Sequence, residues 1–250
     1  MAVYLDFFMY VIIANFGNDS IALIEWVRQQ SLQNVAVLSI DTGWAAESWN
    51  QRVILANHYL VKNNITHVRL KSEYDFSRLV AERQNFPSIK FHWCASFLKG
   101  LPILDWLDQV DPSLNATLLL AKRREQAPAL RDLQEFEPES HSYGDRKVWY
   151  PLYQHTLAQR NILIQQAGFD LLTTRSLECD PCIYNQRSDF KRLDDKRIQQ
   201  VTALEAKIGR PMFSTSIKKI IADDFSEVDT AGNDKSIYYQ GCGSEFGCGD

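Results

Sequence analysis

The sequence has no long hydrophobic run and no basic N-terminal segment. No apolar stretch approaches the roughly 18 residues that a membrane span requires, and Asp6 interrupts the most apolar region, Val3–Ala14. No Lys or Arg precedes Arg28, so a signal peptide, with its basic start and small-residue cleavage site, is not expected. These features predict a cytoplasmic protein that does not enter a membrane.

A strong excess of one charge is also missing. The 250 residues carry 27 Lys and Arg against 31 Asp and Glu, a formal net charge of −4, and 45% of them are hydrophobic. This balance excludes a disordered or fibrous chain and a polycation, although a local basic patch could still bind a polyanion. The length suits one large domain, or a domain with a short appendage. It does not indicate an oligomeric state.

Cysteine is scarce and unevenly placed, at Cys94, Cys179, Cys182, Cys242 and Cys248. Five cysteines cannot pair completely, and a reducing cytoplasm disfavours disulfides. The Cys-x-x-Cys pair at Cys179 and Cys182 presents two thiolates to one metal site, and a redox dithiol is its main alternative. Cys94 taken alone is as readily a buried structural residue.

Over the first 120 residues, short apolar runs alternate with amphipathic stretches, which is typical of βα units around a parallel sheet. Right-handed crossovers between such units give a Rossmann-like, doubly wound α/β fold. Strands are expected at 8–15, 34–40, 66–70 and 116–121, and helices at 19–30, 47–63 and 94–110, the last interrupted at Pro102.

The second half of the chain is less regular. The acidic and polar stretch 130–147 predicts an exposed loop, and helices are expected at 156–168 and 186–208. The last 25 residues are rich in Gly, Asp and Ser and should contain little regular structure. We therefore expect an α/β domain over residues 1–175 and a cysteine-bearing extension over 176–250.

Three turns at predicted strand ends carry residues suited to binding an anion. In the first turn, Gly17 permits a tight backbone bend, including a positive φ, and Asp19 or Ser20 could cap the following helix. The first N–H groups of that helix would face a phosphate in the loop. The full turn is Asn15-Phe16-Gly17-Asn18-Asp19-Ser20.

The other two turns should lie at the same sheet edge, where open α/β sheets bind their ligands. Asp41 begins the Asp-Thr-Gly turn that ends at Gly43, and could hold a ribose hydroxyl or a metal ion. Arg123 and Arg124 follow the fourth strand, and their guanidinium groups suit phosphate or sulfate oxygens. Each turn alone could be an ordinary solvated one; three together favour a ligand site.

In this order, the motifs resemble the PAPS/APS reductase family, part of the PP-loop superfamily of adenine-nucleotide enzymes that includes ATP pyrophosphatases. The likeness runs from about residue 10 to residue 190. Its motifs are Gly17-Asn18-Asp19-Ser20, Ile40-Asp41-Thr42-Gly43, Cys94 to Pro102, Arg123-Arg124-Glu125-Gln126, Tyr150-Pro151-Leu152, and Ser176 to Cys182, the last similar to a segment of the APS reductases that carry a [4Fe–4S] cluster.

The resemblance implies an adenine nucleotide (ATP, APS or PAPS) with Mg²⁺, and a [4Fe–4S] cluster or, as the alternative, zinc. The implied nucleotide-binding residues are the first turn (Asn15, Phe16, Gly17, Asn18, Asp19, Ser20), the second (Asp41, Thr42, Gly43), and Lys99, Arg123, Arg124 and Gln126. The implied metal ligands are Cys94, Cys179 and Cys182, with Cys242 or Cys248 as the fourth. The implied catalytic residues are Asp19, Arg124 and Cys248.

Departures from the family pattern decide the order of the three functional hypotheses. Ala95 stands where cluster-bearing reductases have a second cysteine, and the Glu-Cys-Gly motif of their C-terminus is replaced by Gly241-Cys242-Gly243. Asp19-Ser20 is closer to the loop of the ATP pyrophosphatases. The first hypothesis is therefore an ATP pyrophosphatase in sulfur transfer, with nucleic acid as a candidate acceptor, as in the DNA-phosphorothioation proteins of this family. The alternatives are a thiol-dependent APS/PAPS reductase, and a non-enzymatic Fe–S subunit that binds nucleotide and a cysteine desulfurase or other sulfur donor.

Overall fold

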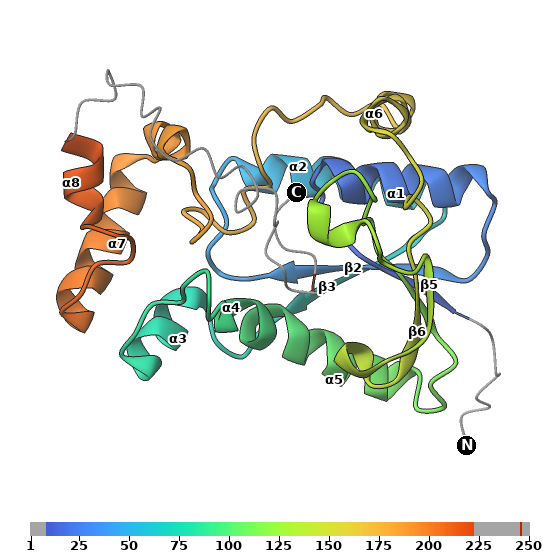
Figure 1. The fold of residues 1–250 in the computed structure, drawn as a ribbon, viewed down its shortest axis with the longest axis horizontal. Helices are drawn as coiled ribbons and strands as arrows, with labels where there is room; N and C mark the ends of the chain where they lie inside the picture. The colour runs from blue at the N-terminus through green and yellow to red at the C-terminus, as the bar shows by residue number, and fades with distance from the viewer. Residues whose placement is uncertain (1–8, 223–245, 247–250) are drawn as a thin grey trace.

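A computed structural model describes residues 9–222 and Phe246 of the chain, and it contains one six-stranded sheet (Figure 1). The strand order is β3-β2-β1-β4-β6-β5, and all neighbours are parallel except β5 and β6. This is the predicted doubly wound α/β fold with one antiparallel edge strand. The strands are β1 (Tyr10–Ile13), β2 (Val35–Asp41), β3 (Thr66–Lys71), β4 (Thr117–Leu119), β5 (Phe136–Ser140) and β6 (Arg146–Trp149).

Helices cover both faces of the sheet, which is why its central strands are continuously apolar. Successive side chains of β1 point to opposite faces, so Ile12 packs under one helical layer while Val11 and Ile13 pack under the other. One layer holds α1 (Asn18–Gln29), α2 (Trp49–Lys62) and α6 (Leu157–Gln166); the other holds α3 (Phe76–Arg83), α4 (Trp93–Ala95) and α5 (Leu101–Val110) (Figure 1).

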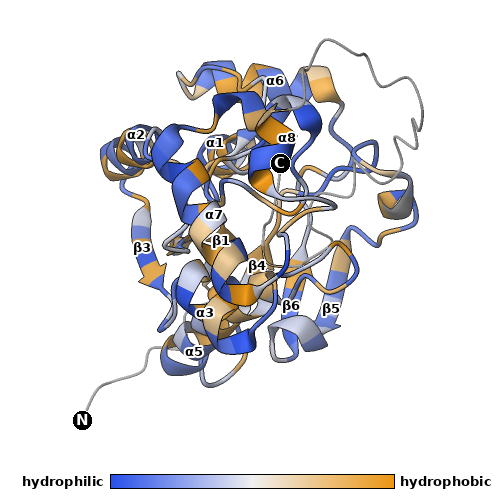
Figure 2. Cartoon of the chain, turned by 90° about the vertical axis from the view of Figure 1, so that its left-hand side faces the viewer, coloured by the Kyte–Doolittle hydropathy of each residue, from blue (hydrophilic) through white to orange (hydrophobic). Residues whose placement is uncertain are grey.

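A third apolar core lies beyond the carboxyl ends of the strands. Here α7 (Asp195–Ile208), α8 (Ile217–Ala222) and the 3₁₀ segment η4 (Arg187–Arg192) pack against α3 and α4 through residues such as Phe76, Phe190 and Val201. Figure 2 views the molecule from this end, with α7 and α8 in front of the strands. Asp194 caps α7 by accepting the Arg197 N–H at 2.7 Å, and Gly209 ends it with φ 73°. No helix in the described ranges 9–222 is long and apolar enough to cross a bilayer.

The prediction of an exposed loop over 130–147 is wrong. This stretch contains η2 (Pro128–Leu130) at its start, then β5, η3 (His141–Tyr143) and β6. Its polarity has two structural causes. Strand β5 is a largely exposed edge strand, and Arg146 on β6 is fully buried but ion-paired with Asp111 at 2.8 Å.

Two predicted helices also differ in detail. The helix expected over 94–110 is not broken at Pro102, which lies in the first turn of α5 and is preceded by residues that already have helical backbone. The irregularity precedes it, as the π-turn η1 (Ser96–Gly100). The helix expected over 186–208 is divided into η4 and α7 at Leu193, which has extended backbone. Helices α3 and α8 were not predicted.

Candidate functional site

The first turn joins β1 to α1 and is held by its own side chains. The Asn15 Oδ1 atom accepts hydrogen bonds from the Gly17 N–H at 2.8 Å and the Ser20 hydroxyl at 3.0 Å. Gly17 is the N-cap residue of α1, so the expectation that Asp19 or Ser20 caps the helix is wrong. Both lie in its first turn, buried, with Asn18. The Asn18 side chain exchanges two hydrogen bonds with the backbone of Leu172.

The strained residue of this turn is Phe16 rather than Gly17. Phe16 has φ 59°, the left-handed region, whereas Gly17 has φ −68°. The Arg52 guanidinium stabilises the unusual backbone, because its Nε donates to the Phe16 carbonyl at 2.7 Å. Burial lowers the pKa of Arg52, with the carboxylate of Asp170 opposing that shift. Sequence reasoning did not identify Arg52, which is an ordinary residue of an amphipathic helix until the fold brings α2 to this loop.

Asp19 is the centre of a buried charge network. Its carboxylate accepts Arg123 Nε at 3.0 Å, Arg160 at 3.2 Å and Gln126 Nε2 at 3.4 Å, and its side chain is 2% exposed. Arg123 also binds Glu125 at 3.2 Å. The structure thus joins the predicted residues Asp19, Arg123 and Gln126 and adds Arg160 from α6. In the sequence, Arg160 is distinguished only by its place near the start of α6, one helical turn after the capping residue Thr156.

Arg124 lies apart from that network. Its side chain is exposed and lines a separate cavity of about 470 Å³ with Arg131 and His155. Burial lowers the pKa of His155 and the nearby Arg123 lowers it further, against the opposite influence of Glu135. His155 is therefore mainly neutral near pH 7. The two arginines that are adjacent in the sequence thus face different surroundings.

The second turn lies beside the first, as predicted, because the carboxyl ends of β1 and β2 are adjacent. Asn15, Phe16, Asp41 and Thr42 line one small cavity of about 20 Å³ at this edge. Asp41 accepts the Gly43 N–H at 3.0 Å and an ion pair from Arg69 at 3.1 Å, and remains one-third exposed. We call this space the nucleotide pocket, after the function proposed below.

The segment 176–182 closes the pocket from the far end of the sequence. Ser176 accepts the Asn15 side-chain amide at 3.1 Å, and the Glu178 carbonyl accepts the Thr42 hydroxyl at 2.7 Å. The Glu178 carboxylate forms a buried ion pair with Lys99. Lys99, predicted to bind nucleotide, therefore has a protein carboxylate as its partner. Sequence reasoning assigned Glu178 no role, although it directly precedes Cys179.

Cys94, Cys179 and Cys182 line a single cavity, together with Lys99, Glu178 and Arg175. We call it the cysteine cavity; its volume is about 40 Å³. The three thiols are partly buried, and the Cys179 Sγ lies 3.5 Å from the Thr42 hydroxyl. Thr42 and Glu178 line both this cavity and the nucleotide pocket. Cys242 and Cys248, either of which is expected as the fourth ligand and of which Cys248 is also expected to be catalytic, lie outside the described residues.

Cationic groups surround the cysteine segment. Arg197 donates to the Ala45 carbonyl at 2.7 Å and lies over the Trp44 ring at 4.3 Å, while Trp44 donates to the Pro181 carbonyl at 3.1 Å. Burial lowers the pKa of Arg197, and Asp180, Asp194 and Cys179 oppose that shift. Burial raises the pKa of Asp180, although Arg192 and Arg197 act against it. These cations and Lys99 could compensate the negative charge of thiolates in the cavity.

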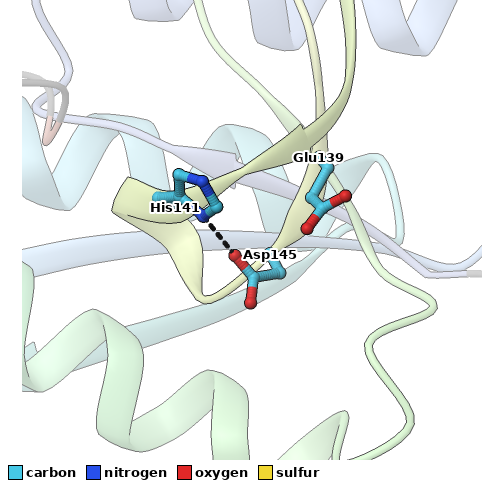
Figure 3. A group of neighbouring side chains, drawn as sticks. All are labelled: Glu139, His141 and Asp145. Carbon is cyan, nitrogen blue, oxygen red and sulfur yellow. Dashed lines mark hydrogen bonds and ion pairs between the residues drawn. The ribbon is translucent and has the colours of Figure 1, made fainter.

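A different group of side chains that could bind a metal lies at the turn between β5 and β6, by the first residues of β6 and away from the carboxyl ends of the parallel strands (Figure 3). In the described part of the chain, Glu139, His141 and Asp145 are the group of three whose ligand atoms lie within 4.8 Å of one another, and all three are exposed. His141 Nδ1 is 2.7 Å from an Asp145 oxygen, which raises the pKa of His141. This is a solvated ion pair with a neighbouring carboxylate, and it has no connection to the cysteine cavity.

No protein-family model matches the chain, and no curated protein sequence matches it. Several solved structures are similar in fold, including these two. One is the phosphate complex of phosphoadenylyl-sulfate (PAPS) reductase from Candida auris, with a TM-score of 0.46, 14% identity, and coverage of 68% of this chain and 76% of that one. The other is the U34-tRNA thiolase NcsA from Methanococcus maripaludis with its [4Fe–4S] cluster, with a TM-score of 0.45, 11% identity, and coverage of 92% and 80%.

The two identities are 14% and 11%, and both TM-scores are below 0.5. At this level of similarity the likeness concerns the fold alone. The residues of the chain itself must therefore carry any assignment of function.

Proposed function

We propose that this protein is a PP-loop-type ATP pyrophosphatase that activates an acceptor oxygen for replacement by sulfur. The observation that carries the proposal is the wall shared by the nucleotide pocket and the cysteine cavity, formed by Thr42 and Glu178. A site for nucleotide cleavage and a set of thiols thus adjoin. Such an arrangement suits a reaction that first activates an oxygen and then delivers sulfur to the same atom.

The nucleotide would be bound by the two adjacent turns. Its phosphates would lie at the N-terminus of α1, where the first N–H groups have no acceptor within the helix and the helix dipole favours negative charge. Asp19 would act as a positioning residue, because its contacts hold Arg123 and Arg160 beside that terminus. The partly exposed Asp41 is the carboxylate of the pocket that could hold Mg²⁺, which neutralises phosphate charge when bound.

The chemistry would proceed in two balanced displacements. An oxygen of the acceptor attacks the α-phosphorus of ATP, and pyrophosphate leaves with the electron pair of the broken P–O bond. A sulfur nucleophile then attacks the acceptor atom that bears the adenylated oxygen, and AMP leaves with that oxygen. Catalysis of this kind depends on positioning and on fixed positive charge. Asp19 and Glu125 offset the charges of Arg123 and Arg160, so the contribution of the Asp19 network would be positioning.

The cysteine cavity supports the proposal of an iron–sulfur cluster, with Cys94, Cys179 and Cys182 as candidate ligands. All three thiols line one space together with the cations Lys99 and Arg175, and cysteine thiolates are the ligands that hold such clusters. Each thiolate of a [4Fe–4S] cluster binds a different iron, so its ligands lie farther apart than the thiolates of a single zinc ion. When bound, such a cluster would supply an iron centre able to bind sulfur. The fourth ligand remains an expectation for Cys242 or Cys248.

A product analysis with ATP, APS and PAPS tests the proposed reaction. We expect AMP and pyrophosphate from ATP, with loss of activity in Asp19→Asn and full activity in the control Glu82→Gln, whose exposed carboxylate pairs with Arg78 on α3. Sulfite release from APS or PAPS without ATP cleavage would instead identify a thiol-dependent reductase. Nucleotide binding without turnover of any of the three would indicate a non-enzymatic subunit of a sulfur-transfer complex.

Metal analysis tests the cluster separately. Protein purified without oxygen should be brown and contain iron and inorganic sulfide. Cys182→Ser should lose the iron, whereas Glu139→Gln, in the exposed group at the turn between β5 and β6, should retain it. Colourless anaerobic protein that contains stoichiometric zinc, or no metal, would exclude the cluster and leave the nucleotide pocket unaffected.

A further inference from the structure

The segment 187–222 is strongly basic in an acidic protein. It carries nine Lys or Arg and four Asp or Glu, while the whole chain has a net charge of −4. Two of the four carboxylates, Asp189 and Glu205, are buried within the segment, so its surface is more basic than its composition. Seven of the nine cationic residues are exposed: Arg187, Lys191, Lys196, Lys207, Arg210, Lys218 and Lys219. This asymmetry is the usual electrostatic signature of a polyanion-binding surface.

A groove of about 830 Å³ lies between this segment and the loop that precedes α4. We call it the basic groove. Its described lining contains no acidic residue, and it combines rings and aliphatic groups with two cations. The residues that define its character are Phe86, Ile89, Lys90, Arg187, Phe190 and Phe213.

Two apolar side chains are unusually exposed in the loop that supplies Ser88, Ile89 and Lys90 to the groove; Ile89 lines the groove, and Phe91 directly follows Lys90. Ser88 and Phe91 form a tight turn through two backbone hydrogen bonds of 3.1 and 3.0 Å. The turn holds Ile89 and Phe91 toward solvent, where they are 48% and 75% exposed. Packing in the hydrophobic core therefore does not explain why apolar residues stand at positions 89 and 91. An exposed ring beside Lys90 is well placed to stack on a flat partner.

The basic groove adjoins the cysteine cavity. Ile183 and Asn185 line both spaces, so the two share part of their walls. An extended molecule bound along the groove would therefore contact residues that also enclose the thiols of Cys94 and Cys182. No such continuity links the thiols to the exposed carboxylates at the turn between β5 and β6.

We propose that the basic groove binds a single strand of nucleic acid and directs it toward the cysteine cavity. Phosphates would meet the cations of the segment 187–222 together with Lys90, and unpaired bases would stack on Phe91 and on the partly exposed Phe213. A duplex fits less well, because its bases are already stacked and cannot reach the ring of Phe91. The role of this strand as the acceptor for sulfur rests on the function proposed above. The binding of the strand to the groove does not depend on that function.

Fluorescence anisotropy with a labelled single strand of about 15 nucleotides tests the proposal on the full chain without ATP. We expect binding that weakens steeply with salt, and weaker binding to the duplex of the same sequence. Phe91→Ala should weaken binding about fivefold or more, in line with loss of one stacking contact. Lys90→Glu should also weaken it. The control Lys62→Glu, at the far end of α2, should not.

The same assay separates this proposal from the enzymatic one. Asp19→Asn should bind the strand normally even where ATP cleavage is lost. A negative result in the ATP-cleavage assay therefore leaves the proposal of strand binding in the groove unaffected. Displacement of the strand by heparin as readily as by unlabelled strand, with no effect of Phe91→Ala, would overturn the proposal in favour of general polyanion binding. Tighter binding of an acidic polypeptide such as polyglutamate than of the strand would overturn it in favour of a protein partner.

Discussion

Removal of one partner of the Lys99–Glu178 ion pair should destabilise the protein strongly, because the remaining charge would lie where water cannot solvate it. The two side chains are 2% and 9% exposed. Glu178→Gln keeps the size of the side chain and removes its charge, so the Lys99 ammonium loses the buried carboxylate opposite it. Removing one partner of a buried ion pair typically costs about 3–5 kcal/mol.

That loss should be visible in thermal and urea unfolding. For a chain of this size each kcal/mol lowers Tm by about 2–4 °C, so we expect Glu178→Gln to lower Tm by about 6–20 °C. The matched control is Glu82→Gln, which breaks an ion pair with Arg78 of 3.0 Å between side chains that are 48% and 55% exposed. An exposed pair of this type contributes at most about 0.5 kcal/mol, so the control should unfold almost as the parent does.

A double variant distinguishes charge burial from loss of packing. Lys99→Met combined with Glu178→Gln removes both charges, and replacement of a whole buried pair by uncharged groups is often neutral. The double variant should therefore be more stable than Glu178→Gln alone. A loss below 1 kcal/mol in Glu178→Gln, or no recovery in the double variant, would refute the reasoning.

Three further predictions follow from single positions. Gly43→Ala should destabilise the fold, because Gly43 has φ +64° and a Cβ there would lie 2.5 Å from the Asp75 Cβ. Gly168 has φ +78° and so shares the backbone strain, but nothing lies within 4 Å of an added Cβ; urea unfolding should therefore show a larger loss for Gly43→Ala than for Gly168→Ala. Arg52→Met should weaken ATP binding in calorimetry by releasing the Phe16 carbonyl, and unchanged affinity would dismiss that role. Burial alone would raise the pKa of Glu25, but hydrogen bonds from Arg28, Tyr59 and Gln29 hold that pKa below its ordinary value of 4.5. Ionised Glu25 therefore stabilises the fold above pH 4.5, and this contribution is lost as the pH falls through the lowered pKa. Glu25→Gln should flatten this acid dependence of Tm.

The sequence predicts the sheet and its binding edge because both depend on local patterns. Apolar runs followed by Gly, Asp or Thr mark where a parallel strand ends, and parallel strands end at a common edge. The edge strand β5 escaped prediction because an exposed strand with buried, ion-paired Arg146 beside it has the composition of a loop. Helix α3 escaped because it is only Phe76–Arg83, too short for a clear period.

The sequence predicts several residues of the candidate site, but it does not predict which of these residues contact each other. Asp19 and Arg123 were identified separately, yet nothing in either turn shows that they bind each other across 104 positions of the chain. Arg160 and Glu178 carry no motif for such contacts, and Arg52 matters only because α2 packs beside the first turn. Pairing of this kind is a property of the assembled fold, since a charge in the sequence does not indicate which opposite charge it will meet.

The wall formed by Thr42 and Glu178 has a thermodynamic consequence, because residues shared by two neighbouring spaces can couple what binds in one to what binds in the other. Any occupant of the nucleotide pocket that shifts these two residues changes the free energy of the cysteine cavity. Linkage then requires reciprocity: if nucleotide changes the affinity of the cavity for its occupant by some factor, that occupant changes the affinity for nucleotide by the same factor. If the cavity holds a metal and the pocket binds ATP, as proposed, loss of that metal would register as a change in the dissociation constant of ATP.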